Sequence, residues 1–181
     1  MRFPPLKQED MTPAQREVAA EIAAGPRGEV RGPFIALIHH PALARRIQAL
    51  GEQLRWKSKL PPRLLELAVL VAARRWTCQH EWVMHEKLAR EAGLGLQIIK
   101  SIGERKDPQD MSEDEQAVYA FCRDAHDTGR VGDAAFDLVK NRFGLDGALE
   151  LLALSGYYSL MAMVLNTAGM PLPGGAEPPL K

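Results

Sequence analysis

The sequence predicts an all-α protein. No stretch alternates polar and apolar residues for long enough to make a convincing strand. Helix start and stop signals follow one another along the whole chain instead, with apolar residues at helical spacing between them. With 181 residues, of which 46% are hydrophobic and 25% charged, the chain suits one soluble helical bundle with a sizeable core.

Cap and stop residues bound the expected elements. Thr12 caps the first helix and Pro13 takes its first position, whereas Ser112 and Glu115 form a capping box. Gly144 ends one helix shortly before the last long helix begins. In chain order we expect an arm at 1–11, helices at 13–24, 41–56, 62–75, 78–92, 95–102, 112–127, 133–143 and 147–167, a short apolar turn at 34–38, and a Pro/Gly-rich tail from 171.

Composition limits the partners and the compartment. Lys plus Arg equals Asp plus Glu at 23 each, so nothing steers the protein toward nucleic acid or an anionic membrane. Two cysteines make no disulfide framework, and the N-terminus lacks an apolar core of signal-peptide length, so we expect a cytoplasmic protein. Residues 151–176 carry no charge, but the Ser, Gly, Tyr, Asn and Thr residues among them favour a helix buried against other helices over a membrane span.

The stretch 66–85, ELAVLVAARRWTCQHEWVMH, holds the chemistry. Its first part is an apolar helix with a single carboxylate, Glu66. Its second part places Cys78, Glu81 and His85 at spacings of three and four, which puts all three on one face of a helix. A thiol, a carboxylate and an imidazole beside a buried acid are the parts of a proton-transfer or thiol site.

Each of these residues also has a purely structural interpretation. Glu66 could be a first-turn acid or a partner for Arg63, although a carboxylate in so apolar a helix needs a buried partner or a purpose. Cys78 could be a small core residue, but at the first turn of a helix the dipole would lower the pKa of its thiol. Cys122 faces apolar neighbours, so we expect it in the core.

We expect no metal and no cofactor. Cys78, Glu81 and His85 would supply only three ligands from one helix, and no HExxH pair, glycine-rich phosphate loop or dinucleotide fingerprint is present. The neighbouring pair Arg74 and Arg75 could hold an acidic substrate, yet a solvated helix end is the favoured interpretation.

These residues resemble a known family, the carboxymuconolactone decarboxylase and alkylhydroperoxidase D (AhpD-like) superfamily of small helical proteins. The resemblance is carried by Glu66, the run 78–82 (CQHEW), His85 and the run 88–94 (LAREAGL), and extends to 156–173. It covers about residues 33–173, so we divide the chain into an arm and first helix (1–32), the family-like domain (33–173) and a tail (174–181). It implies trimers or hexamers, with a site on a two-helix hairpin near a subunit interface.

The two branches of the superfamily suggest different chemistry. The hydroperoxidase branch uses a glutamate, a CxxC pair and a histidine, and Glu66, Cys78 and His85 match three of those four positions. Glu81 stands where that branch has the cysteine that attacks peroxide, so no disulfide can close within this motif. The decarboxylase branch resembles the chain at Glu81 and His85 and needs no cysteine pair.

Three hypotheses follow. The first is a cofactor-free acid/base enzyme, a decarboxylase or isomerase for a small organic acid or lactone, in which His85 and Glu81 exchange the proton, Glu66 orients them and Cys78 lines the site. The second is a thiol-dependent hydroperoxidase with Cys78 as the thiolate. The third is a non-catalytic oligomer that binds a ligand in the same pocket.

Overall fold

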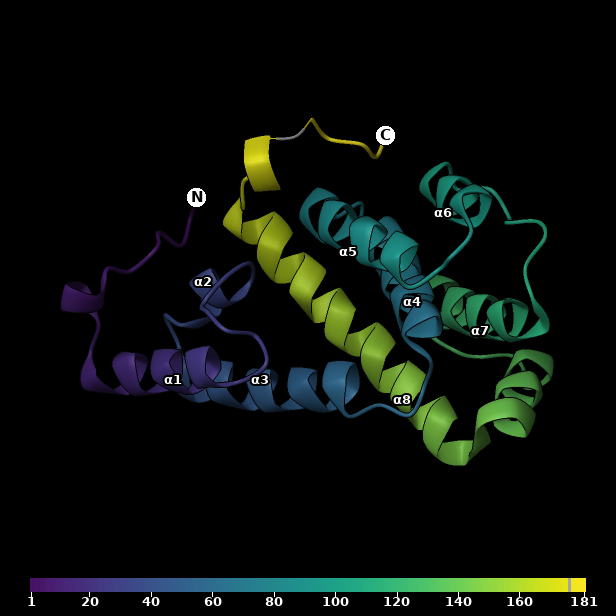
Figure 1. Cartoon of the computed structure of the whole chain (residues 1–181), viewed down its shortest axis with the longest axis horizontal. Coiled ribbons are helices and arrows are strands. Elements are labelled where there is room, and N and C mark those ends of the chain that lie inside the picture. The colour runs from purple at the N-terminus through teal and green to yellow at the C-terminus, as the bar shows by residue number, and fades with distance from the viewer. Residues whose placement is uncertain (176) are drawn as a thin grey trace. The chain divides into compact units, whose positions relative to one another are not determined.

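The structure, a computed structural model, describes residues 1–175 and 177–181, and these residues form helices and no strand. The prediction of an all-α fold is therefore confirmed (Figure 1). The helices are η1 (Gln8–Asp10), α1 (Pro13–Ala24), α2 (Phe34–Leu37), α3 (Pro41–Trp56), α4 (Pro62–Arg75), α5 (Gln79–Glu91), α6 (Leu96–Gly103), α7 (Glu113–Thr128), α8 (Asp133–Ala168) and η2 (Pro173–Gly175).

The helix boundaries follow the caps found in the sequence. Thr12 and Gln15 form a capping box at α1, with Pro13 at the first helical position, and Ser112 and Glu115 form another at α7. The α7 helix ends at Gly129, whose φ of 71° is the left-handed conformation that glycine adopts without strain. Of the predicted tail, residue 176 lies outside the described residues.

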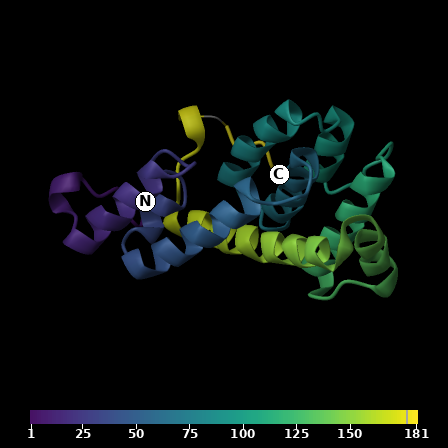
Figure 2. The ribbon, with the colours of Figure 1, turned by 60° about the horizontal axis from the view of Figure 1, so that its bottom comes forward.

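Helix α8 contains the break between two helices that the sequence predicts. The label α8 covers Asp133–Ala168, but Gly144 within it has φ 74° and ψ 179°, which are not helical values. The helix direction changes there, as Figures 1 and 2 show. The prediction that one helix ends at Gly144 and a second long helix follows it is therefore confirmed.

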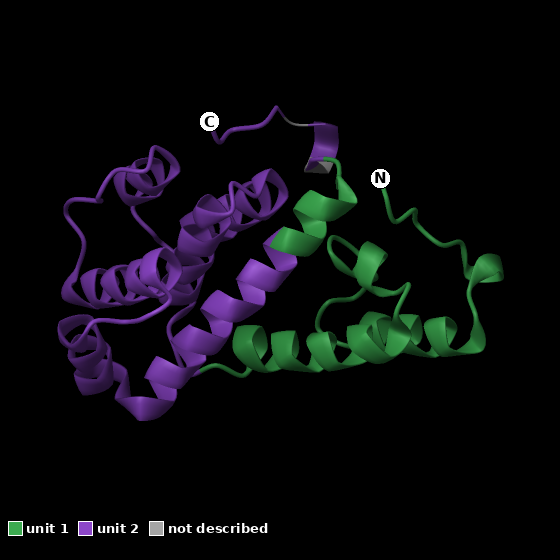
Figure 3. Ribbon diagram, turned by 180° about the vertical axis from the view of Figure 1, so that it is seen from behind, with its two compact units in different colours: residues 1–58, 163–171 green, residues 59–162, 172–181 purple. Residues whose placement is uncertain are grey.

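The chain divides into two compact units, shown in different colours in Figure 3. The first contains residues 1–58 and 163–171 and is built on α1, α2 and α3. Its core includes the fully buried side chains of Val18, Ile22 and Phe34. The Arg27 guanidinium lies 4.3 Å from the centre of the Phe34 ring, which covers this part of the core with a cation–π contact.

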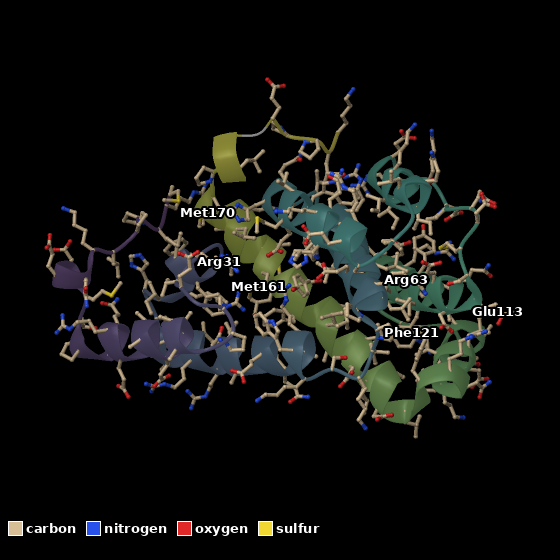
Figure 4. All side chains as sticks on the ribbon, in the orientation of Figure 1. Arg31, Arg63, Glu113, Phe121, Met161 and Met170 are labelled. Carbon is tan, nitrogen blue, oxygen red and sulfur yellow. The ribbon has the colours of Figure 1, made fainter. Side chains whose placement is uncertain are left out.

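The second unit contains residues 59–162 and 172–181, and α4 is its central helix. Helix α4 packs against α5, α6 and α7, and every residue from Glu66 to Arg74 is buried, as expected for a helix that is apolar on all sides. Phe121 of α7 is fully buried, and it lies on the same side of the unit as Arg63 of α4 (Figure 4). Arg63 forms an ion pair of 3.4 Å with buried Glu115, not with Glu66.

The C-terminal residues of the second unit lie against α5. The Gln79 side-chain amide donates to the Leu180 carbonyl at 2.7 Å and accepts from the Leu180 N–H at 2.9 Å. Arg74 donates to the Lys181 main-chain oxygen at 2.6 Å, and the Leu180 side chain is buried. The side-chain amide of Gln79 therefore forms a pair of hydrogen bonds with the backbone of Leu180, in the way that two backbone groups pair between neighbouring strands.

By length and composition, α8 is the one helix among the described residues that could cross a membrane. Half of its most apolar 18-residue window is buried inside the structure. The core helix of a soluble protein passes the same test, so the apolar character of α8 is weak evidence for a span.

Candidate active site

A tight turn joins α4 to α5 and sets the positions of the site residues. The Cys78 N–H donates to the Ala73 carbonyl at 2.8 Å and the Thr77 N–H donates to the Arg74 carbonyl at 3.1 Å, which is the Schellman pattern of helix ends. Thr77 takes the left-handed position of this motif with φ 44°, a conformation that costs a β-branched residue about 1–3 kcal/mol. Its hydroxyl oxygen compensates by accepting hydrogen bonds from Arg74 at 3.0 Å and from Arg105 at 3.1 Å.

The predicted stripe forms as the spacing requires. Cys78 is the N-cap residue of α5, and Glu81 and His85 follow at the first and second turns. All three are buried, and so is Glu66 on α4. The structure thus places all four predicted residues in the interior of the α4–α5 hairpin.

Three of the four are joined through a single imidazole. His85 Nδ1 lies 2.6 Å from Glu66 Oε2, and His85 Nε2 lies 3.1 Å from Glu81 Oε2. The ring of Tyr158 on α8 meets the His85 ring edge-on, with a centroid distance of 5.0 Å and an angle of 85°. The imidazole is therefore bonded at both nitrogens and held in its plane by an aromatic neighbour. We call Glu66, Glu81 and His85 the Glu–His–Glu triad.

This geometry requires an extra proton in the triad. A neutral imidazole has one N–H donor and one lone pair, and a lone pair facing an ionised carboxylate would be repelled. An imidazolium, which donates from both ring nitrogens, satisfies both carboxylate oxygens. Burial by itself lowers the pKa of His85, but the hydrogen bonds and charges of Glu66 and Glu81 outweigh it, so the net effect raises the pKa above 6.5.

Cys78 differs from the expectation. Its side chain is fully buried, and burial raises the pKa of the thiol to about 12. The backbone N–H groups of Glu81 and His80 act in the expected direction and lower it, but they do not outweigh burial. The prediction of a depressed thiol pKa is thus wrong, because the helix dipole acts on a group that has lost its contact with water.

Cys122 lies in the core, as predicted. It is fully buried on α7, its sulfur accepts from the Ser155 hydroxyl at 3.7 Å, and burial raises its pKa to about 12. Both cysteines are free thiols.

Two features of the surroundings were not predicted. Tyr158 belongs to a motif noted in the sequence, but nothing in its spacing connects it with the histidine that it contacts. Arg74 was expected at a solvated helix end, yet it is buried, while Arg75 is exposed as expected. A helix end is solvated only if nothing packs on it. Nothing in the sequence pattern indicates that the C-terminal residues pack on the end of α4, as they do in the structure.

The surroundings of the triad comprise the hollows near it and the side chains that are candidates for holding a metal ion. Two hollows on the second unit, of about 700 and 430 Å³, are both lined by Arg74 and residues of α6, and neither is lined by Glu66, Cys78, Glu81 or His85. Among residues 1–175 and 177–181, no group of three or more His, Cys, Asp or Glu side chains is arranged to hold a metal ion. Both nitrogens of the buried imidazole already face carboxylates.

The described residues thus form an all-helical fold with a buried glutamate–histidine pair on the α4–α5 hairpin. The sequence model of the carboxymuconolactone decarboxylase family matches residues 41–105, which include all four predicted site residues. No match was found among curated proteins.

The fold has a counterpart among solved structures. A crystal structure from Ralstonia eutropha JMP134, described as an alkylhydroperoxidase AhpD core and an uncharacterized peroxidase-related protein, matches with a TM-score of 0.75. The two sequences are 18% identical, and the match covers 96% of this chain and 92% of that one. Together the two comparisons confirm the resemblance to the AhpD-like superfamily.

Proposed function

We propose that this protein is a cofactor-free enzyme that decarboxylates or isomerises a small organic acid or lactone. The observation that carries the proposal is the imidazole of His85 bonded at both nitrogens by buried carboxylates. A buried, oriented acid–base group with a perturbed pKa is typical of proton-transfer sites. The match of residues 41–105 to the decarboxylase family model supports the same chemistry.

The two carboxylates have different roles in this proposal. Glu66 makes the shorter contact, 2.6 Å to Nδ1, and holds the ring as the third member of a catalytic triad holds its base. The Nε2 side, where Glu81 lies at 3.1 Å, is the working side. Proton exchange between His85 and Glu81 lets either group face the substrate as acid or base.

The proposed decarboxylation balances with these groups alone. The bond between the substrate carbon and its carboxylate breaks, CO₂ leaves, and the electron pair moves into a conjugated carbonyl. The His85 imidazolium then donates its proton to carbon, and solvent reprotonates the ring. In an isomerisation the unprotonated imidazole of His85 takes a proton from one carbon of the substrate, and the resulting imidazolium returns the proton to another carbon.

Hydrogen exchange at carbon tests the proposal without a known substrate. Unsaturated γ-lactones bearing a carboxylate are incubated with the protein in D₂O, and NMR follows deuterium incorporation and loss of the carboxyl group. We expect catalysed exchange or decarboxylation that falls at least 100-fold in His85→Ala and Glu81→Gln. The matched control is Glu86→Gln, which removes the same charge from the same helix. Equal rates in the wild type and His85→Ala would refute the proposal.

A thiol-dependent hydroperoxidase is the second candidate. It is favoured by the fold shared with a peroxidase-related protein and by Cys78 beside the triad. Two observations weigh against it: the raised pKa of Cys78, and a histidine whose nitrogens both face carboxylates and cannot readily take the thiol proton. Cys78-dependent reduction of an organic hydroperoxide, with turnover in the presence of a thiol, would replace the first proposal with this one.

We also propose that the protein assembles with copies of itself into a trimer or hexamer. One face of α8 exposes Leu145, Leu149 and Leu152 at helical spacing, with Leu149 66% exposed. A continuous apolar stripe of this kind is typical of subunit interfaces. Light scattering should show an oligomer that dissociates in Leu149→Glu but not in the control Leu138→Glu, which lies before Gly144. A wild-type monomer would refute the assembly.

A further inference from the structure

The larger hollow of the second unit lies next to the candidate site without opening into it. Its volume is about 700 Å³, and none of the four predicted site residues lines it. Trp82 does line it, and Trp82 follows Cys78 by four residues and precedes His85 by three. Residues three and four apart are neighbours on the surface of a helix, so the Trp82 side chain lies beside both. Trp82 is thus the side chain of α5 that separates the hollow from the site.

Two residues hold Trp82 from the side of the hollow. A Cβ atom at Gly103, the last residue of α6, would lie 3.0 Å from Trp82 Cζ2, so the indole ring lies directly against the glycine backbone. The same point lies 3.9 Å from Leu180 Cδ2. Trp82 and Leu180 are 4% and 6% exposed, and both line the hollow. The Leu180 side chain therefore packs beside the indole over Gly103.

Leu180 belongs to the segment 177–181, which we call the C-terminal strap and which is part of the second unit (Figure 3). The strap is bonded on both sides of the α4–α5 turn. Leu180 pairs with the Gln79 side chain at 2.7 and 2.9 Å, and the Lys181 main-chain oxygen accepts from Arg74 at 2.6 Å. Within the strap Leu180 is buried and the other four residues are exposed. A segment with one buried side chain belongs to the least stable part of a fold, so it opens before the helices separate.

The burial of the site makes such an opening necessary. Cys78 is 0% and His85 is 3% exposed, so neither can contact a substrate while the side chains around them keep their positions. Entry between the packed helices α4, α5 and α7 would require them to separate. Release of the strap removes the Leu180 contact from the indole and leaves these helices in place.

We propose that the C-terminal strap controls entry to the candidate site. With the strap bound, Trp82 closes the site from the larger hollow; with the strap released, Trp82 turns away and a small ligand enters from the hollow. A volume of about 700 Å³ is sufficient for a metabolite. The closed state excludes water from the triad, which strengthens the electrostatic interactions within it. This inference rests on the proposed function for the identity of the ligand, and it adds how access to the same site is regulated.

Alkylation of Cys78 by iodoacetamide measures the opening without a known substrate. A buried thiol reacts only in those molecules in which it is open to water, so its rate reports the open population. Leu180→Ala removes most of the side chain that packs beside the indole, and Trp82→Phe makes the separating side chain smaller. We expect Cys78 to react at least about 10-fold faster than in the wild type in Leu180→Ala, and at least about 3-fold faster in Trp82→Phe.

Two controls separate this opening from a general loosening of the fold. Cys122 on α7 is fully buried and lines neither hollow, and peptide mass spectrometry counts its reaction separately from that of Cys78. Leu96→Ala makes the same replacement as Leu180→Ala in the α6 wall of the same hollow, at a side chain that is 63% exposed.

The outcomes decide the proposal. Faster reaction of Cys78 in Leu180→Ala and in Trp82→Phe, with the rate of Cys122 unchanged and Leu96→Ala like the wild type, supports control by the strap. An unchanged rate of Cys78 in one of the two variants, or an equal rise at both cysteines, would overturn it. Because alkylation requires no reaction at the triad, failure of this inference is distinguishable from failure of the proposed acid–base chemistry.

Discussion

Replacing Glu66 with Gln tests the charge of the triad directly. Gln has nearly the shape of Glu but no charge, so the contact of 2.6 Å with His85 Nδ1 loses its ionic part. A hydrogen bond to a charged group contributes about 1.5–3 kcal/mol, and removing one partner of a buried pair costs about 3–5 kcal/mol. Because Gln keeps an acceptor oxygen, we expect a loss of about 2–3 kcal/mol in the free energy of unfolding, or roughly 4–12 °C in Tm.

The pH dependence of this loss identifies its origin. The folded-state pKa of His85 is raised above 6.5, so the stability contributed by its charged form is fully present below that pH and is lost as the pH rises through the folded-state value. In Glu66→Gln the pKa of His85 falls back toward its ordinary value. The difference between variant and wild type should therefore be largest near pH 6 and smaller near pH 9.

Urea denaturation at both pH values measures the effect, with Glu86→Gln as the control. Glu86 lies next to His85 in sequence and is paired with half-exposed Arg90, so its replacement should cost less than about 1 kcal/mol. A loss in Glu66→Gln that does not change between pH 6 and pH 9, or that equals the loss in the control, would refute the charged triad.

Three further predictions concern other positions. A thiol with a pKa of about 12 is a thiolate in only about one molecule in 10⁵ at pH 7. The mass that the wild type gains in a brief peroxide exposure should therefore be no larger than the mass that Cys78→Ser gains, and rapid Cys78-dependent oxidation would contradict this. Gly144→Ala should lower the free energy of unfolding by about 1–3 kcal/mol, because φ is 74° and a Cβ there would lie 2.7 Å from an Asp146 oxygen, while Gly156→Ala, with no atom in the way, should be neutral or stabilising in the same denaturation assay. Thr77→Val keeps the side-chain shape but removes the acceptor of two arginine hydrogen bonds, so its Tm should fall by an amount equivalent to about 1–3 kcal/mol, and an unchanged Tm would show that those bonds contribute nothing.

Much of the fold could be predicted because its signals are local. The capping boxes at Thr12 and Ser112 involve residues three apart, and they mark the starts of α1 and α7 in the structure. The turn between α4 and α5 could be placed but not explained, because Thr77 carries none of the usual signs of a left-handed residue. Its conformation is supported by Arg105, which lies 28 residues away.

The candidate site could also be predicted in part: its residues and their shared helix face were predicted, whereas the pKa of its thiol was not. The spacing of Cys78, Glu81 and His85 fixed one face of a helix, and that face is buried as expected. The thiol pKa could not be predicted, because it depends on the depth of burial, which other helices decide. The burial of Arg74 was missed for a similar reason, since it depends partly on Lys181, which lies 107 residues away.

The position of the triad in the chain has a consequence for folding. His85 is 19 residues from Glu66 and one helical turn from Glu81, so the acid–base groups form within a single helix hairpin. Closing so short a loop costs little chain entropy, and contacts of low sequence separation form early. Tyr158 on α8 and the packing of α6 and α7 on α4 join from farther along the chain. The hairpin therefore determines which groups meet, and the rest of the second unit supplies the dry surroundings that set their proton affinity.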